Sequence, residues 1–181
     1  MKKYPTIVDG LCDIFEKKKI LKHSEISTLK KKFEHSDLTF EEFVIREGII
    51  EKKYVLEALG ELYEIPAIDV DGIFFDHHLV RMFPKDEMLR NIFIPYLHDG
   101  PVLVIIANNP RNNTLFEIAG RYVSYDVTCM VGLARDIIDA IEDFFDESMQ
   151  LEEDRKQHDP IPEEVEKTEE QEEIEDIINN E

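Results

Sequence analysis

Two apolar runs separated by a turn, residues 92–107, read IFIPYLHDGPVLVIIA. Both runs are rich in aromatic and β-branched side chains, and Asp99-Gly100 lies between them. An Asp-Gly pair between such runs favours a β-hairpin. Asn108-Asn109-Pro110 then ends the second run. We therefore expect two antiparallel strands, residues 92–97 and 102–107, in a small and mostly antiparallel sheet.

Helices and one further strand are predicted on either side of this hairpin. Pro66 keeps residues 65–70 extended, Asp76 is placed to cap a short helix, and Pro84 is placed to open another. Downstream, the apolar spacing predicts a helix over 114–123, a strand over 126–131 and a helix over 136–145. Residues 64–145 are thus expected to form a small α/β domain.

Residues 1–63 predict four short helices built from two copies of one unit. A shift of 29 residues places Ile14-Phe15 on Phe43-Val44, Ile20-Leu21 on Ile49-Ile50, and Phe33 on Leu62. The second copy opens with Thr39 followed by Glu42, which fits a capping box. This pattern indicates a duplicated helical hairpin, and the whole chain is assigned to the α+β class.

The charge of the chain is concentrated at its C-terminal end. The chain holds 41 acidic and 21 basic residues, a net charge of −20, of which residues 146–181 contribute 16 acidic and 3 basic, or −13. Few apolar groups and a high charge predict a disordered acidic tail over 146–181. Ile174, Ile177 and Ile178 have helical spacing, so folding of this end on a partner stays open.

Several classes of function are excluded or disfavoured by the residues. No glycine is followed by lysine, which excludes a P-loop nucleoside triphosphatase for this chain. The acidic balance argues against nucleic acid as a partner. The longest apolar run, 102–107, is too short to cross a membrane, and the N-terminus has no secretory pattern. Cys12 and Cys129 are expected to be buried free thiols, so we expect a cytoplasmic protein.

Candidate catalytic and metal-binding residues are few. Asp76-His77-His78 and His98 invite a metal site, but adjacent histidines on a helix point about 100° apart, and we expect Asp76 to be a cap and both histidines to be exposed. A serine hydrolase would need Ser124 or Ser148, and neither follows the pattern of a nucleophile elbow. We therefore predict no catalytic residue, no metal and no cofactor.

Two lysine clusters mark the N-terminal helices. Lys17-Lys18-Lys19 and Lys30-Lys31-Lys32 fit the solvated faces of amphipathic helices. The alternatives are contact with anionic lipid, with an acidic partner, or with the acidic tail of the same chain.

Five strings occur in an order that is typical of one family; they are residues 46–50 (REGII), 65–70 (IPAIDV), 76–84 (DHHLVRMFP), 104–110 (VIIANNP) and 136–141 (DIIDAI). On these strings the chain, from about Leu11 to Phe145, resembles the N-terminal domain of the type II secretion and type IV pilus assembly ATPases (E-component, MshE N-terminal type). That domain does not hydrolyse ATP. The resemblance implies a non-enzymatic docking or regulatory module that binds a protein partner.

The resemblance also indicates the kind of partner. In the family, the domain is linked to a hexameric ATPase, or contacts the cytoplasmic part of an inner-membrane assembly protein, which would place this chain at the inner membrane through its partner. No ATPase domain is present in the 181 residues, so a stand-alone protein and a fragment both stay open. The oligomeric state also stays open.

A subset of the family binds cyclic di-GMP with two repeats that open Arg-Leu-Gly and close with Gln. The corresponding residues here are Gly10-Leu11-Cys12 with Phe33, and Thr39-Phe40-Glu41 with Leu62. The planar guanidinium fork of the arginine is lost in both copies, and Glu41 would repel a dinucleotide. We treat six positions as a degenerate dinucleotide site: Gly10, Cys12, Phe33, Thr39, Glu41 and Leu62. A cyclic di-GMP receptor and an acidic competitor that acts through its tail remain the alternative functions.

Overall fold

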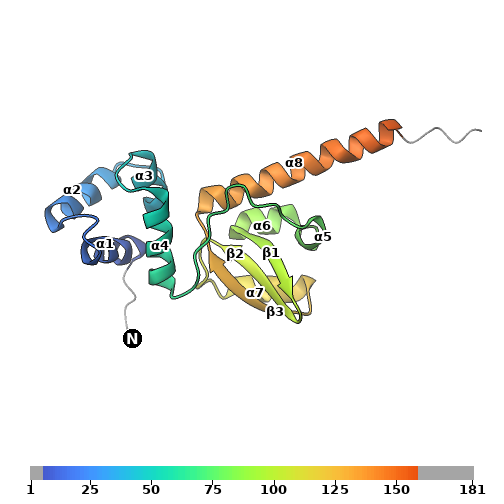
Figure 1. Cartoon of the computed structure of the whole chain (residues 1–181), viewed down its shortest axis with the longest axis horizontal. Helices are drawn as coiled ribbons and strands as arrows, with labels where there is room; N and C mark the ends of the chain where they lie inside the picture. The colour runs from blue at the N-terminus through green and yellow to red at the C-terminus, as the bar shows by residue number, and fades with distance from the viewer. Residues whose placement is uncertain (1–5, 159–181) are drawn as a thin grey trace, which may run out of the picture. The chain divides into compact units, whose positions relative to one another are not determined.

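The structure is a computed structural model that describes residues 6–158, with side chains up to Asp146. The chain divides into two compact units, residues 1–146 and 147–181. The first unit contains four N-terminal helices, the sheet and the helices that cover it (Figure 1).

The four N-terminal helices are α1 (Ile7–Lys17), α2 (His23–Phe33), α3 (Phe40–Arg46) and α4 (Lys52–Tyr63) (Figure 1). The predicted capping box at α3 is present in one half. The Thr39 hydroxyl accepts a hydrogen bond from the Glu42 amide at 3.4 Å. The Glu42 carboxylate accepts from Arg46, one turn later, at 3.5 Å. Glu42 is thus bound to its (i, i+4) neighbour.

The two helical hairpins share the same corner, which confirms the predicted repeat. Lys19 and Gly48 both adopt positive φ, 59° and 64°. The next amide bonds back to an equivalent carbonyl in each copy, Ile20 N to Phe15 O at 2.9 Å and Ile49 N to Val44 O at 3.0 Å. These carbonyls would otherwise be unsatisfied at a helix C-terminus. The left-handed turn therefore ends the first helix of each hairpin.

An extended segment and two short helices connect the hairpins to the sheet. The Ile68 amide donates to the Val131 carbonyl at 2.9 Å, which attaches the extended segment to the edge of the sheet. The Asp76 carboxylate accepts from the His78 amide at 2.7 Å and caps α5 (His77–Val80), as predicted. Pro84 then stands immediately before the first residue of α6 (Lys85–Asn91).

The sheet has three strands in the order β1-β2-β3: β1 (Phe93–Asp99), β2 (Val102–Ala107) and β3 (Asp126–Val131). The predicted hairpin is confirmed, because β1 and β2 pair antiparallel, and Gly100 turns between them at φ 56°. β3 follows α7 (Thr114–Tyr122) and pairs parallel to β2. The expected sheet was mostly antiparallel; the sheet formed is mixed, with one pairing of each kind.

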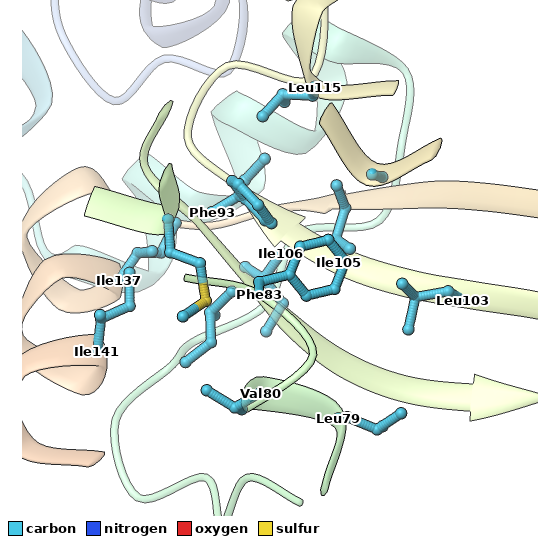
Figure 2. Packing of buried hydrophobic residues seen from close by; sticks show 14 of the residues in the cluster. Leu79, Val80, Phe83, Phe93, Leu103, Ile105, Ile106, Leu115, Ile137 and Ile141 are labelled. Carbon is cyan, nitrogen blue, oxygen red and sulfur yellow. The ribbon is translucent and has the colours of Figure 1, made fainter. Parts of the chain in front are cut away.

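Both faces of the sheet are covered by apolar side chains (Figure 2). Ile105 and Ile106 are neighbours on β2 and are both fully buried, and successive residues of a strand point to opposite faces. Ile106 faces the helix that follows β3, since a Cβ added at Gly132 would lie 2.8 Å from Ile106 Cγ2 and 3.3 Å from Ile137 Cδ1. The sheet is therefore the middle layer of a sandwich, as its apolar strands predict.

A second hydrophobic cluster lies between the N-terminal helices, and Val131 and Leu133 from the end of β3 pack into it. The predicted division into domains 1–63 and 64–145 stays a prediction, with one cluster centred in each range. Cys12 and Cys129 are both free and buried, as expected. No helix within residues 6–158 is long and apolar enough to span a membrane.

The last helix is longer than expected. α8 runs from Ala134 to His158, whereas the sequence pattern predicted a helix that ended at 145 and a disordered tail from 146. Residues 147–158 read ESMQLEEDRKQH, which are good helix formers without glycine or proline. The rest of the predicted tail, 159–181, lies outside the described residues.

Candidate functional site

Four of the six predicted dinucleotide positions are packed inside the hairpins. Gly10 of α1 touches Leu62 of α4, and a Cβ added at Gly10 would lie 2.5 Å from Leu62 Cδ1. Cys12 is 1% exposed. The Phe33 ring packs against the rings of Phe40 and Phe43, with centroids 5.1 and 5.6 Å away. These four positions contribute to helix packing.

The other two positions, Thr39 and Glu41, line a cleft of about 620 Å³. The cleft is bounded by α3, by the start of α4, by Asp71 of the extended segment, and by residues 133–136 at the start of α8. Its volume falls within the range of about 300–1,000 Å³ that is usual for ligand sites. We take this cleft as the candidate functional site.

A lysine surrounded by carboxylates forms one wall of the cleft. The Lys52 ammonium lies 2.6 Å from Asp69 Oδ1 and 2.9 Å from Asp136 Oδ2, and it also contacts the Asp71 carboxylate. Partial burial lowers the pKa of Lys52, but the hydrogen bonds from these carboxylates outweigh it and raise the pKa well above its usual value. The cluster therefore ties α4 to the extended segment and to α8.

Two carboxylates of this cluster, Asp69 and Asp136, respond differently to the same lysine. The pKa of Asp69 is lowered, because its contacts with Lys52 outweigh the effect of burial. The pKa of Asp136 is raised, because desolvation outweighs the same cation. Their exposure explains the difference, since the Asp136 side chain is 17% exposed and that of Asp69 is 51%.

The same carboxylates have the spacing of metal ligands. Oxygen atoms of Asp69, Asp71 and Asp136 lie within 4.8 Å of one another, close enough to share one cation. The Lys52 ammonium already contacts all three, so the group is an ion-pair network with its own cation. The sequence-based expectation of no metal site stays a prediction.

Sequence reasoning missed this cluster, although one local sign of it exists. Lys52 and Lys53 open α4, where the positive end of the helix dipole disfavours cations. A lysine at such a position indicates a nearby anion. The anions that Lys52 contacts include Asp69 and Asp136, which lie 17 and 84 positions further along the chain. A local sequence pattern does not identify partners at such separations.

Glu41 also lines the cleft and is 7% exposed. Desolvation raises the pKa of its carboxyl group, against the opposing effects of hydrogen bonds from its own amide and from the Thr39 hydroxyl. Among the side chains of residues 6–146, no Lys, Arg or His pairs with it. The cleft thus holds one satisfied charge cluster and one buried carboxylate without a cation.

The comparison with known proteins decides the family of the α/β part. The MshEN domain model matches residues 63–151. This segment belongs to the MshEN domain family. The match begins at the last residue of α4 and includes the sheet, so Lys52 and Glu41 precede the MshEN segment and Asp69, Asp71 and Asp136 lie within it.

Proteins similar to this chain include a pilus protein and two proteins of known structure. The type IV pilus assembly ATPase PilB of Myxococcus xanthus (strain DK1622) is 22% identical over 104 residues, which cover 58% of this chain and 18% of PilB. A structure of MshE with cdg matches with a TM-score of 0.59 and 16% identity, over 74% of this chain and 97% of the MshE chain. The N-terminal domain of XpsE matches with a TM-score of 0.54 and 15% identity, over 78% of this chain and 97% of the XpsE chain. The chain thus spans about a fifth of PilB and shares its fold with MshE and the XpsE domain.

Two of the three histidines of the MshEN segment lie against aromatic rings in a tilted arrangement. His77 lies against Phe144, with ring centroids 4.5 Å apart, and His98 lies against Tyr125 at 4.2 Å. His77 and His78 are exposed at the start of α5, as expected. Asp76, His78 and His98 line one pocket, but within residues 6–146 they do not form a group with the spacing of metal ligands. Ser124 is exposed before β3, and the side chain of Ser148 lies outside the described ones.

Proposed function

We propose that the chain is a non-enzymatic docking and regulatory module of a type II secretion or type IV pilus ATPase system, and that it binds a protein partner. The observation that carries the proposal is the MshEN match over residues 63–151. The PilB relative and the fold likeness to MshE and the XpsE N-terminal domain support it.

The residues of the cleft favour docking over catalysis. Lys52 has a raised pKa and is held by three carboxylates, so its amine is a poor nucleophile or base at neutral pH. Both cysteine thiols are buried, and burial raises the pKa of Cys129 to about 11. Thiolates are therefore scarce at neutral pH. The lack of any Gly-Lys pair supports the same conclusion for ATP hydrolysis.

The proposed partners are the hexameric ATPase of such a system and the cytoplasmic part of its inner-membrane assembly protein. Either would place this chain in the cytoplasm and at the inner membrane through its partner. The test is biolayer interferometry with the purified full chain immobilised and each candidate from the same organism in solution. Saturable binding below about 50 μM of one candidate is expected. No binding of either, while the N-terminal domain of an authentic ATPase binds on the same sensor, overturns the proposal.

The competing function is a cyclic di-GMP receptor, because a protein of similar fold, MshE, has a structure with cdg. Docking is favoured here because Gly10, Cys12, Phe33 and Leu62 are occupied in helix packing. Titration calorimetry with cyclic di-GMP at about 100 μM protein is expected to show no heat, which bounds the affinity at roughly millimolar or weaker. A stoichiometric heat would replace docking with nucleotide sensing.

A further inference from the structure

Glu41 differs from its counterpart in the first hairpin in a way that helix packing does not explain. The position 29 residues earlier is Cys12, and both side chains lie on the buried side of the first helix of their hairpin, 1% and 7% exposed. A thiol behaves as a small apolar group there. A carboxylate at the same position loses its hydration. Cys12 shows that the packing of a hairpin does not require a charged side chain at this position.

The cations around the cleft are engaged by carboxylates other than Glu41. Arg46 pairs with Glu42 at 3.5 Å, and Arg135 pairs with Asp139 at 2.7 Å. Lys52 is held by its three aspartates. The charged residues that line the cleft are four acids (Glu41, Glu42, Asp71 and Asp136) and three bases (Arg46, Lys52 and Arg135), which leaves a net charge of −1. Asp69 and Asp139, which pair with Lys52 and Arg135, bring the acids to six against the same three bases, and Glu41 is the lining carboxylate that pairs with none of the three.

The other groups that line the cleft suit a long cationic side chain. Ile45, Leu133 and Ala134 give apolar surface for a methylene stem. Glu41 lines the cleft from α3 and pairs with none of the three bases there, so its carboxylate is available to a head group with several donors. A guanidinium presents five N–H donors in a rigid fork, is less strongly hydrated than an ammonium, and pairs with carboxylates in a bidentate manner.

We infer that this cleft binds an arginine side chain of a protein partner, with the Glu41 carboxylate as its anchor. The inference rests on the proposed docking function and names the contact through which docking occurs. The guanidinium fills the missing cation position beside Glu41, and its stem lies on Ile45 and Leu133. Binding replaces the lost hydration of the carboxylate by charge-assisted hydrogen bonds.

The experiment uses a small probe, so that the cleft is tested apart from any partner. N-acetyl-arginine amide is titrated into the ¹⁵N-labelled full chain and followed by amide chemical shifts. We expect saturable shifts confined to residues 39–46 and 133–136, with a Kd in the millimolar range. N-acetyl-citrulline amide, which has the same shape without the charge, is expected to give none. Equal shifts with citrulline, or no shifts with arginine at 50 mM, overturn the inference.

Variants separate the anchor from general surface charge. Glu41→Gln is expected to weaken the arginine probe about tenfold, and Glu41→Asp, which keeps the charge, to weaken it less. Glu47→Gln is the matched control, because Glu47 is an exposed acid at the end of the same helix outside the cleft. Equal loss in both glutamine variants overturns the inference. An N-acetyl-lysine amide that binds as tightly as the arginine probe overturns the choice of arginine.

The outcomes distinguish this inference from the docking function on which it rests. If a partner of the ATPase system binds the wild-type chain and Glu41→Gln equally well, the inference of arginine binding in the cleft is wrong and the docking function stands. If the arginine probe binds at the cleft but neither ATPase-system protein binds the chain, docking to that system is wrong.

Discussion

The two helical hairpins, residues 7–33 and 40–63, have the same backbone and different chemistry. Each turns at a residue with φ near 60°, and each makes the same hydrogen bond back to the preceding helix. The buried position that holds Cys12 in the first holds Glu41 in the second, and His23 corresponds to Lys52. The two hairpins thus share the corner geometry, while Lys52 and Glu41, which line a cleft together with Asp136 of the α/β part, belong to the second.

This difference shows which residues belong to folding and which belong to the cleft. Residues that both hairpins need, such as those at the corners, are retained in geometry even where the residue type changes. Residues that only one hairpin carries, such as Lys52 and Glu41, line the cleft, and Lys52 pairs with Asp136 outside the repeat. Substitutions at matched positions of the two hairpins therefore separate the contribution to folding from the contribution to the cleft.

The largest expected effect is the loss of Lys52. Lys52→Met leaves Asp69, Asp71 and Asp136 close together without a cation, and this repulsion in a partly buried site is expected to lower the free energy of unfolding by about 2 kcal/mol. The matched control is His23→Met, at an exposed position of the first hairpin, with an expected change below about 0.5 kcal/mol. Urea denaturation at pH 7 measures both. Equal changes would show that the cluster does not stabilise the fold.

The corner residues are expected to give the next largest effect, with opposite signs in the two hairpins. Gly48→Ala places a Cβ at φ 64° and is expected to destabilise by about 1 kcal/mol, whereas Lys19→Gly relieves the same strain at φ 59° and is expected to stabilise by a few tenths of a kcal/mol. Gly120→Ala, in the last turn of α7 with open space around it, is expected to stabilise through helix propensity alone. The same sign at both corners would contradict equivalent backbone strain.

Local pattern was sufficient for the features that depend on neighbouring residues. The Asp76 cap, the Asp99-Gly100 turn and the 29-residue repeat are set by residues a few positions apart or by the sequence compared with itself. β3 and β2 are separated by α7, and a strand-helix-strand order of this kind favours parallel pairing, so the predicted elements already contained a sign of the mixed sheet. The Lys52 cluster, in contrast, joins residues up to 84 positions apart, so it appeared only in the structure.

The helix α8 was underestimated for a different reason. The high charge of residues 147–158 favours disorder, but glutamate, lysine, arginine and glutamine also favour helices. The composition is thus compatible with disorder and with helix. The buried Ile137 and Ile141 lie in the first turns of α8, and these packed turns nucleate the helix that continues through 147–158.

A smaller effect is expected from Glu41, and it depends on pH. The pKa of Glu41 in the folded chain is raised above its usual value of 4.5, so the folded state binds the proton more tightly than the unfolded state. Stability from this group is present below the usual value and is lost as the pH rises through the raised value. Glu41→Gln is therefore expected to raise the Tm by about 2 °C at pH 7.5 and to leave it unchanged near pH 3.5.

The groups around Glu41 that bear on this titration are Glu42 on α3 and Tyr63 at the end of α4, and the pKa of Tyr63 is itself raised, first by burial and then by the charge of Glu41. Cys12→Ser is the matched change at the corresponding position, and its effect on the Tm is expected to be the same at both pH values. Differential scanning fluorimetry measures each variant. A gain for Glu41→Gln that persists at pH 3.5 would assign the effect to packing.

The smallest expected effect is that of removing residues 159–181, which hold 11 acidic residues and one lysine. If docking occurs through the cleft of the second hairpin, a chain that ends at His158 should bind the ATPase-system partner within about twofold of the full chain, at both 50 and 300 mM salt. Binding through the acidic segment would instead fall steeply with salt in the full chain, because its charges are exposed to screening. A tenfold loss on truncation would therefore favour the acidic competitor, and Glu41→Gln in the truncated chain would then have no further effect.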